Sequence, residues 1–174
     1  FNDEIYIGSS AGVYKFSTSN SNFIDFSENQ RKILSLVHTN SGDLWVSTGY
    51  PVASIQVYRN SILLKSIDHL EVDRIRNLFI NETKAFAIYE GSDDVGVLEF
   101  NLEQDGLPDY KDFFSKESIS TQLLEIYNIF VKDIYLYAIT SQGLFKSNLD
   151  SNKKLKSNWE LILDSEVILD AISF

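Results

Sequence analysis

Apolar and polar residues alternate with a period of two along most of the chain, in short runs that are rich in β-branched and aromatic residues. Such alternation is typical of half-buried β-strands, and it predicts an all-β protein. A helical pattern is weak and confined to residues 118–125, where we expect at most a turn or two. The predicted strands cover residues 4–8, 13–17, 23–26, 33–38, 43–47, 55–59, 63–67, 75–80, 85–89, 95–100, 110–114, 126–131, 134–139, 143–147, 159–163 and 167–174.

These strands recur in groups. The stretch from Ile33 to Asn60 holds three strands, and fragments of the same pattern occur three more times. Tyr6 and Gly12 in IYIGSSAGVYKF correspond to Tyr137 and Gly143 in LYAITSQGLFKS. Both pairs lie 131 positions apart, which is three repeats of about 44 residues. Repeats of this length with four strands each are typical of β-propeller blades.

We therefore predict a single domain over residues 1–174, a β-propeller of about four blades, each a four-stranded antiparallel sheet. Blades that stack face to face bury both faces of each sheet, which one sheet cannot do alone. Two arrangements stay open: the chain ends complete one blade and close a four-bladed ring, or the chain is an arc of a larger propeller. The predicted blades cover residues 1–27 with 167–174, 33–67, 75–114 and 125–163.

One stretch joins an apolar first strand, a Gly turn, a Leu-Trp-Val-Ser-Thr strand and a third strand ending in Tyr. Its residues are Ile33, Leu36, Gly42, the run 44–48, Ile55, Val57 and Tyr58, and Gly12–Phe16 and Gly143–Ser147 match its last part. This pattern resembles the propeller repeat of two-component regulators. Such repeats occur in extracytoplasmic sensor regions of bacterial hybrid histidine kinases and in a surface propeller protein of the type IX secretion machinery. The resemblance implies blade geometry and a periplasmic or cell-surface location, but it identifies no ligand.

The chain departs from that pattern in two ways, and a second resemblance competes with it. Residues 50–53 expand the loop before the third strand, and other repeats carry Tyr or Phe in place of Trp45. Sialidase-like repeats carry Ser-x-Asp-x-Gly-x-x-Trp, and this chain matches them at Gly42 and Trp45 but has His38 and Asn40 at the first two positions.

Composition excludes several classes of partner and of chemistry. The formal net charge of −10 argues against binding to nucleic acid or to anionic membrane surfaces, because both need a basic footprint. The absence of cysteine excludes disulfides, thiol nucleophiles and cysteine-ligated zinc. No apolar run approaches the ~20 residues of a membrane-spanning helix. The chain begins at Phe1 and contains no methionine, so we expect a processed or excised piece of a longer protein.

The motifs that suggest chemistry have simpler interpretations. Residues 8–12 read G-x-S-x-G, but a strand follows where a nucleophile elbow needs a helix, so we expect a hairpin turn. His38 and His69 stand in no metal-ligand spacing. The acidic run 90–96 lacks the spacing of a calcium loop and is expected to be a solvated turn. We therefore predict no catalytic residue, no metal and no cofactor.

Binding is the function that this pattern favours. In a propeller, the loops that join second and third strands share one face, here the loops at residues 9–12, 48–53, 90–96 and 140–143. An exposed aromatic side chain there can anchor a sugar or a protein. The candidate binding residues are Tyr50, Pro51, Glu90, Asp93 and Asp94.

We accordingly expect a non-catalytic, extracytoplasmic module for binding, sensing or assembly, with a protein or a saccharide as its partner. Two alternatives stay open. A propeller glycosidase or lyase would need a pair of carboxylates, for which Glu90 and Asp93 are the candidates. A purely structural scaffold would need no ligand.

Overall fold

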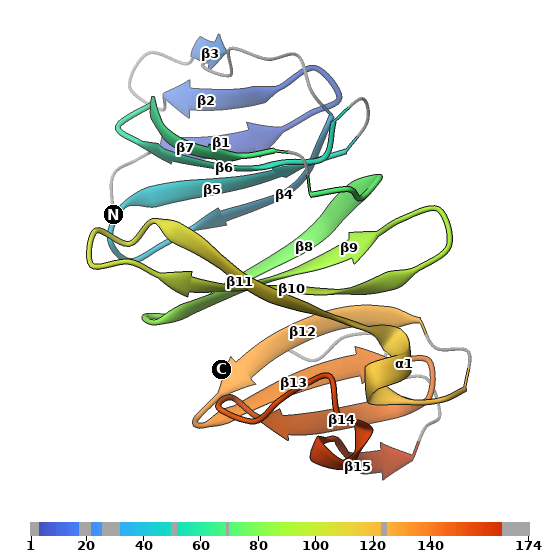
Figure 1. The fold of residues 1–174 in the computed structure, drawn as a ribbon. Helices are drawn as coiled ribbons and strands as arrows, with labels where there is room; N and C mark the ends of the chain where they lie inside the picture. Colours follow the sequence, from blue (N-terminus) through green and yellow to red (C-terminus); the bar gives the residue numbers. More distant parts are fainter. Residues whose placement is uncertain are drawn as a thin grey trace. The chain divides into compact units, whose positions relative to one another are not determined.

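The computed structural model describes residues 4–17, 22–25, 32–49, 52–68, 70–122 and 125–164, which form strands joined by short turns (Figure 1). The strands are β1 (Glu4–Gly8), β2 (Val13–Ser17), β3 (Asn22–Asp25), β4 (Ile33–His38), β5 (Asp43–Thr48), β6 (Ile55–Arg59), β7 (Ile62–Ile67), β8 (Arg74–Ile80), β9 (Lys84–Glu90), β10 (Val95–Leu102), β11 (Pro108–Ser115), β12 (Ile126–Lys132), β13 (Tyr135–Thr140), β14 (Gly143–Asn148) and β15 (Glu160–Asp164).

Helical structure is limited to two short segments. α1 spans Lys116–Ile119, and the 3-10 turn η1 spans Lys156–Asn158. α1 begins two residues before the expected segment 118–125. In the described part of the chain, neither segment has the length and apolar character that a membrane crossing requires.

The strands form four antiparallel sheets in chain order: β1-β2-β3, β4-β5-β6-β7, β8-β9-β10-β11 and β12-β13-β14-β15. The prediction of an all-β fold is thereby confirmed. Every strand predicted between residues 4 and 163 is present, with ends that differ by at most two residues. The predicted strand at 167–174 lies outside the described residues, so the first sheet is described with three strands.

The chain divides into two compact units, Phe1–Leu78 and Phe79–Phe174, and each is described by itself. In the first unit, the sheet β1–β3 packs on the sheet β4–β7. Tyr6 and Val13 from the first sheet meet Leu44, Val46 and Tyr58 from the second. Because side chains alternate along a strand, Leu44 and Val46 point toward the first sheet, while Trp45 lies on the opposite face and is fully buried.

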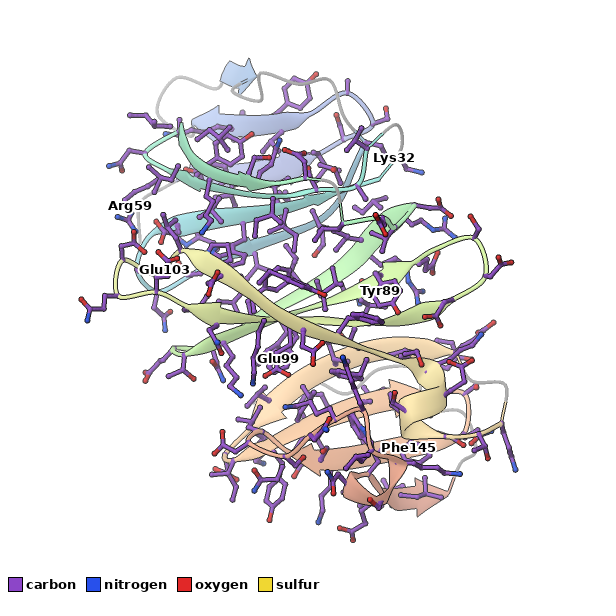
Figure 2. The ribbon with its side chains drawn as sticks, viewed as in Figure 1. Lys32, Arg59, Tyr89, Glu99, Glu103 and Phe145 are labelled. Atoms are coloured by element: carbon purple, nitrogen blue, oxygen red, sulfur yellow. The ribbon has the colours of Figure 1, made fainter. Side chains whose placement is uncertain are left out.

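In the second unit, the sheet from β9 to β11 packs on the sheet β12–β15. Phe86 and Ile88 on β9 meet Leu136 and Ala138 on β13, and Trp159 lies in the same core. The layer is apolar except at one edge, where Glu99 occupies the position opposite Phe86 in the register of β9 and β10. Figure 2 shows Glu99 on the side of its sheet that faces β12–β15.

Candidate functional site

The predicted acidic loop is a tight turn between β9 and β10. Glu90 ends β9, and the amide of Gly91 donates to the carbonyl of Asp94 at 2.8 Å. The side chain of Asp93 is exposed, whereas those of Glu90 and Asp94 are half-buried. The prediction of a turn here is confirmed. Two further candidates, Tyr50 and Pro51, lie outside the described residues.

Asp94 has a structural partner. The hydroxyl of Tyr89 donates to the Asp94 carboxylate at 2.7 Å. Burial of Tyr89 raises the pKa of its hydroxyl well above the ordinary value, and the hydrogen bond to the Asp94 carboxylate raises it further. Tyr89 therefore stays protonated and fixes the Asp94 side chain against the turn. Asp93 is the carboxylate of this turn that points most fully to solvent.

Two other turns share one hydrogen-bond pattern. The hydroxyl of Ser9 donates to the carbonyl of Gly12 at 3.2 Å, and the hydroxyl of Thr140 donates to that of Gly143 at 2.9 Å. Both glycines have positive φ, 141° and 127°, which favours glycine because it has no Cβ. The motif at residues 8–12 is followed by β2 and not by a helix, so it is a hairpin turn, as predicted.

Within each unit, the predicted loops lie at one end of the sheets. In the first unit, the amide of Ile33 at the start of β4 donates to the carbonyl of Ser9, and the amide of Gly49 donates to the carbonyl of Lys32. In the second unit, the turn before β10 lies beside the end of β11, because Gly96 pairs with Ser115. A common face made by loops of both units stays a prediction.

Polar side chains close this end of the second unit. The hydroxyl of Ser120 donates to the side-chain carbonyl of Gln142 at 3.0 Å, and the amide group of Gln142 donates to Gln122 at 2.7 Å. These contacts join the segment after α1 to the β13–β14 turn.

A hollow of about 1050 Å³ lies between the two sheets of the first unit, near the β4–β5 turn. The rings of Tyr6 and His38 stack there, with centroids 6.1 Å apart and planes 21° from parallel. Its lining combines aromatic, apolar, amide, hydroxyl and cationic side chains. The lining residues are Ile5, Tyr6, Lys15, Leu36, His38, Thr39, Asn40, Gly42, Leu44 and Asn60.

Such a lining suits a polar ligand that also carries an apolar face. The ring pair offers a flat surface, while the side-chain amides of Asn40 and Asn60 offer hydrogen-bond donors and acceptors. Among the lining residues that the structure describes there is no carboxylate, although the chain as a whole has a net charge of −10. Sequence reasoning did not identify the hollow, because Tyr6 and His38 belong to different sheets.

The second unit contains a cluster of charges that sequence reasoning also missed, formed by Lys84, Glu99, Lys111 and Lys153. Lys84 and Lys111 donate to one oxygen of Glu99, at 3.0 and 2.8 Å. The ammonium of Lys153 lies 3.2 Å from the other oxygen. The side chains of Glu99 and Lys153 are only 5% and 2% exposed, so both charges are almost fully removed from water.

The cluster joins β9, β10 and β11 to the loop after β14. The carbonyl of Leu149 in that loop accepts hydrogen bonds from Lys84 at 3.0 Å and from Lys153 at 2.6 Å. Every ammonium group therefore has a partner, which is the condition under which buried charges are tolerated. We interpret the cluster as a structural link between the sheets of the second unit and not as a ligand site.

The pKa values in the cluster follow from this geometry. Burial by itself would raise the pKa of Glu99, but the hydrogen bond from Lys111 and the charges of Lys153 and Lys84 outweigh it and lower the pKa. Burial lowers the pKa of the Lys153 ammonium, and the neighbouring ammonium groups add to that effect against the opposing charge of Glu99. Glu99 is thus held as a carboxylate at neutral pH.

Metal binding finds no support in the geometry. Across the residues that the structure describes, no three His, Cys, Asp or Glu side chains gather where they could hold a metal ion. Comparison with protein-family models finds no match for this chain, and no curated protein matches it either.

Proposed function

We propose that this chain is a β-propeller repeat module, extracytoplasmic in location, that binds a saccharide or a protein without chemistry of its own. The successive antiparallel four-stranded sheets support the propeller architecture, as do the matching turns at Ser9–Gly12 and Thr140–Gly143. The resemblance to two-component-regulator repeats supports the location.

The hollow of the first unit is the observation that carries the binding function. It combines a stacked ring pair with amide and hydroxyl groups, which is the composition expected of a site that fixes a polar ligand by a few directed hydrogen bonds. The exposed carboxylate of Asp93 in the β9–β10 turn offers a second candidate contact, which is better suited to a protein.

Binding can be tested with the purified chain on a glycan array and in pull-downs from a bacterial surface extract. We expect His38→Ala and Asn40→Ala to weaken glycan binding at least tenfold if the hollow is the site. We expect Asp93→Asn to weaken protein capture if the turn is the site.

Matched controls are available for both surfaces. Asn101 is an exposed amide outside the hollow, and Glu82 is an exposed carboxylate at the opposite end of β9, so Asn101→Ala and Glu82→Gln should leave binding unchanged. Thermal unfolding of each variant separates a lost contact from a lost fold. A chain that captures nothing in either assay would instead be a structural scaffold, and the proposal would be wrong.

A further inference from the structure

The turn between β8 and β9 carries a sequence motif that the proposed binding function does not use. β8 ends at Ile80 and β9 begins at Lys84, so Asn81, Glu82 and Thr83 form the connection. These three residues read Asn-x-Thr, the acceptor triplet for N-linked glycosylation, and no other Asn-x-Ser or Asn-x-Thr triplet occurs in the sequence. The triplet is short, so the geometry of the turn has to show whether a glycan can be carried there.

The side chain of Asn81 holds the turn together through its oxygen. The carbonyl oxygen Oδ1 accepts hydrogen bonds from the backbone amides of Thr83 at 2.9 Å and of Lys84 at 2.7 Å. The hydroxyl of Thr83 donates to the same oxygen at 3.4 Å. Asparagine commonly stabilises a turn in this way, by bonding to backbone groups two or three residues further on.

The nitrogen of the same side chain is left for another role. Among the residues that the structure describes, none forms a hydrogen bond with Nδ2 of Asn81, and this nitrogen is not sealed from solvent. Glu82 and Thr83 beside it are exposed. A glycan attaches to Nδ2 and leaves Oδ1 as an acceptor, so the hydrogen bonds of the turn persist in the modified chain.

The position of the turn is also compatible with the proposed binding function. The β8–β9 and β9–β10 turns lie at opposite ends of their sheet (Figure 1). β9 joins the two turns and has seven residues, which corresponds to about 20 Å of extended strand. A glycan on Asn81 therefore leaves the exposed carboxylate of Asp93 accessible.

We propose that Asn81 is an N-glycosylation site. The donor is an oligosaccharide carried on a polyprenyl diphosphate. Nδ2 forms a bond to the anomeric carbon, the bond between that carbon and the diphosphate oxygen breaks, and the diphosphate leaves with the electron pair. One proton of Nδ2 passes to a base of the transferase. The proposal rests on the extracytoplasmic location proposed above, because the acceptor triplet is used in exported chains.

Expression of the full chain behind a cleavable signal peptide in a eukaryotic secretory host tests the site. A C-terminal tag with its own Asn-Ala-Thr triplet is the internal control, because its glycan shows that the exported chain has met the transferase. We expect the secreted chain to carry a glycan on Asn81 as well as on the tag. Digestion with peptide-N-glycosidase should convert both glycosylated asparagines to aspartate, which mass spectrometry detects. A chain with a modified tag and an unmodified Asn81 would overturn the proposal.

Matched variants assign the glycan to this triplet. Asn81→Asp keeps an oxygen acceptor for the amides of Thr83 and Lys84 but has no amide nitrogen, so it should carry the tag glycan only. Thr83→Ala should lose the glycan and Thr83→Ser should keep it. Asn101→Asp, outside any acceptor triplet, should also keep it. Thermal unfolding checks each fold, and a second glycan that persists in Asn81→Asp would contradict the assignment.

Failure of this site can be distinguished from failure of the earlier proposals. The signal peptide imposes export, so the expression experiment tests the acceptor independently of the natural location. Recovery of the natural chain from the cytoplasm of its source would refute the location, and with it the modification. A glycosylated chain that captures nothing on the glycan array or in pull-downs would refute the binding function and leave the glycosylation site standing.

Discussion

At the scale of single residues, Glu99 has a large expected effect on stability. Its carboxylate is the only negative charge within hydrogen-bond distance of Lys84, Lys111 and Lys153 among the described side chains. Glu99→Gln would leave these ammonium groups near one another with only the exposed carboxylate of Asp150, 3.9 Å from Lys84, as a counter-charge, and two of the ammonium groups are poorly hydrated. We expect the free energy of unfolding, measured in urea, to fall by about 3 kcal/mol.

Lys153→Met is the matched comparison for that variant. It removes a desolvated ammonium but leaves Glu99 paired with Lys84 and Lys111, and its side chain still packs near the ring of Phe86. We expect the free energy of unfolding to fall by at most about 1 kcal/mol. Equal losses from the two substitutions would mean that the cluster does not act through the charge of Glu99.

The same carboxylate gives a pH dependence with a definite sign. The pKa of Glu99 is lower in the folded chain than its ordinary value of 4.5, so the fold favours the ionised form. The stabilisation is present above pH 4.5 and is lost as the pH falls through the folded-state pKa. Melting temperatures of the natural chain and Glu99→Gln should therefore converge in acid, and a constant difference down to pH 3 would contradict this assignment.

The sequence predicted the features whose residues are neighbours in the chain, but not those whose residues are far apart. Glu90, Asp93 and Asp94 are neighbours in the chain, and a glycine among them predicts a turn. Lys84, Glu99, Lys111 and Lys153 are far apart in sequence and look like ordinary surface charges. Lys84, Glu99 and Lys111 meet because β9, β10 and β11 pair in one sheet, and Lys153 joins them from the loop after β14, which local pattern cannot reveal.

At the scale of elements, alternation predicted nearly every strand because each strand has to place apolar residues on the faces that sheets bury. The ends were harder to place. β11 begins at Pro108, two residues before the predicted start, and a bulge between Glu99 and Phe100 shifts the register beside it. Such irregularities depend on the neighbouring strand and leave no periodic signal.

Two turn glycines allow a matched test of strand pairing. A Cβ at Gly143 would overlap the carbonyl group of Leu163 on β15, whereas a Cβ at Gly42 would meet nothing within 4 Å. Both residues have positive φ, so both alanine substitutions carry backbone strain of about 1 kcal/mol. We expect Gly42→Ala to cost that amount and Gly143→Ala to cost about 3 kcal/mol or more, since it also disrupts the β14–β15 pairing.

Chemical denaturation of the two variants measures this difference, and circular dichroism checks that the strands persist. Hydrogen exchange gives the location: amides of β14 and β15 should lose protection in Gly143→Ala but not in Gly42→Ala. Similar losses of stability from both substitutions would mean that β15 contributes little to the folded sheet.

At the scale of the whole molecule, each of the two compact units contains a hydrophobic cluster of its own. The core of the first is built from residues between Tyr6 and Leu63, and that of the second from residues between Phe79 and Trp159. The chain contains two tryptophans, and one lies in each unit: Trp45 is fully buried and Trp159 is 8% exposed. Trp159 belongs to the cluster of the second unit and Trp45 lies on β5 of the first unit, so each tryptophan reports on the unit whose strands carry it.

This arrangement predicts that a destabilising substitution in one unit lowers the stability of that unit more than the stability of the other. Two single-tryptophan chains allow this test. Trp159→Phe leaves Trp45 to observe the first unit, and Trp45→Phe leaves Trp159 to observe the second. Glu99→Gln is then introduced into each chain. Since every partner of Glu99 lies in the second unit, the urea midpoint reported by Trp159 should fall by more than the midpoint reported by Trp45. Equal shifts would show that the chain unfolds as one cooperative body, in which the loss of either core removes the other.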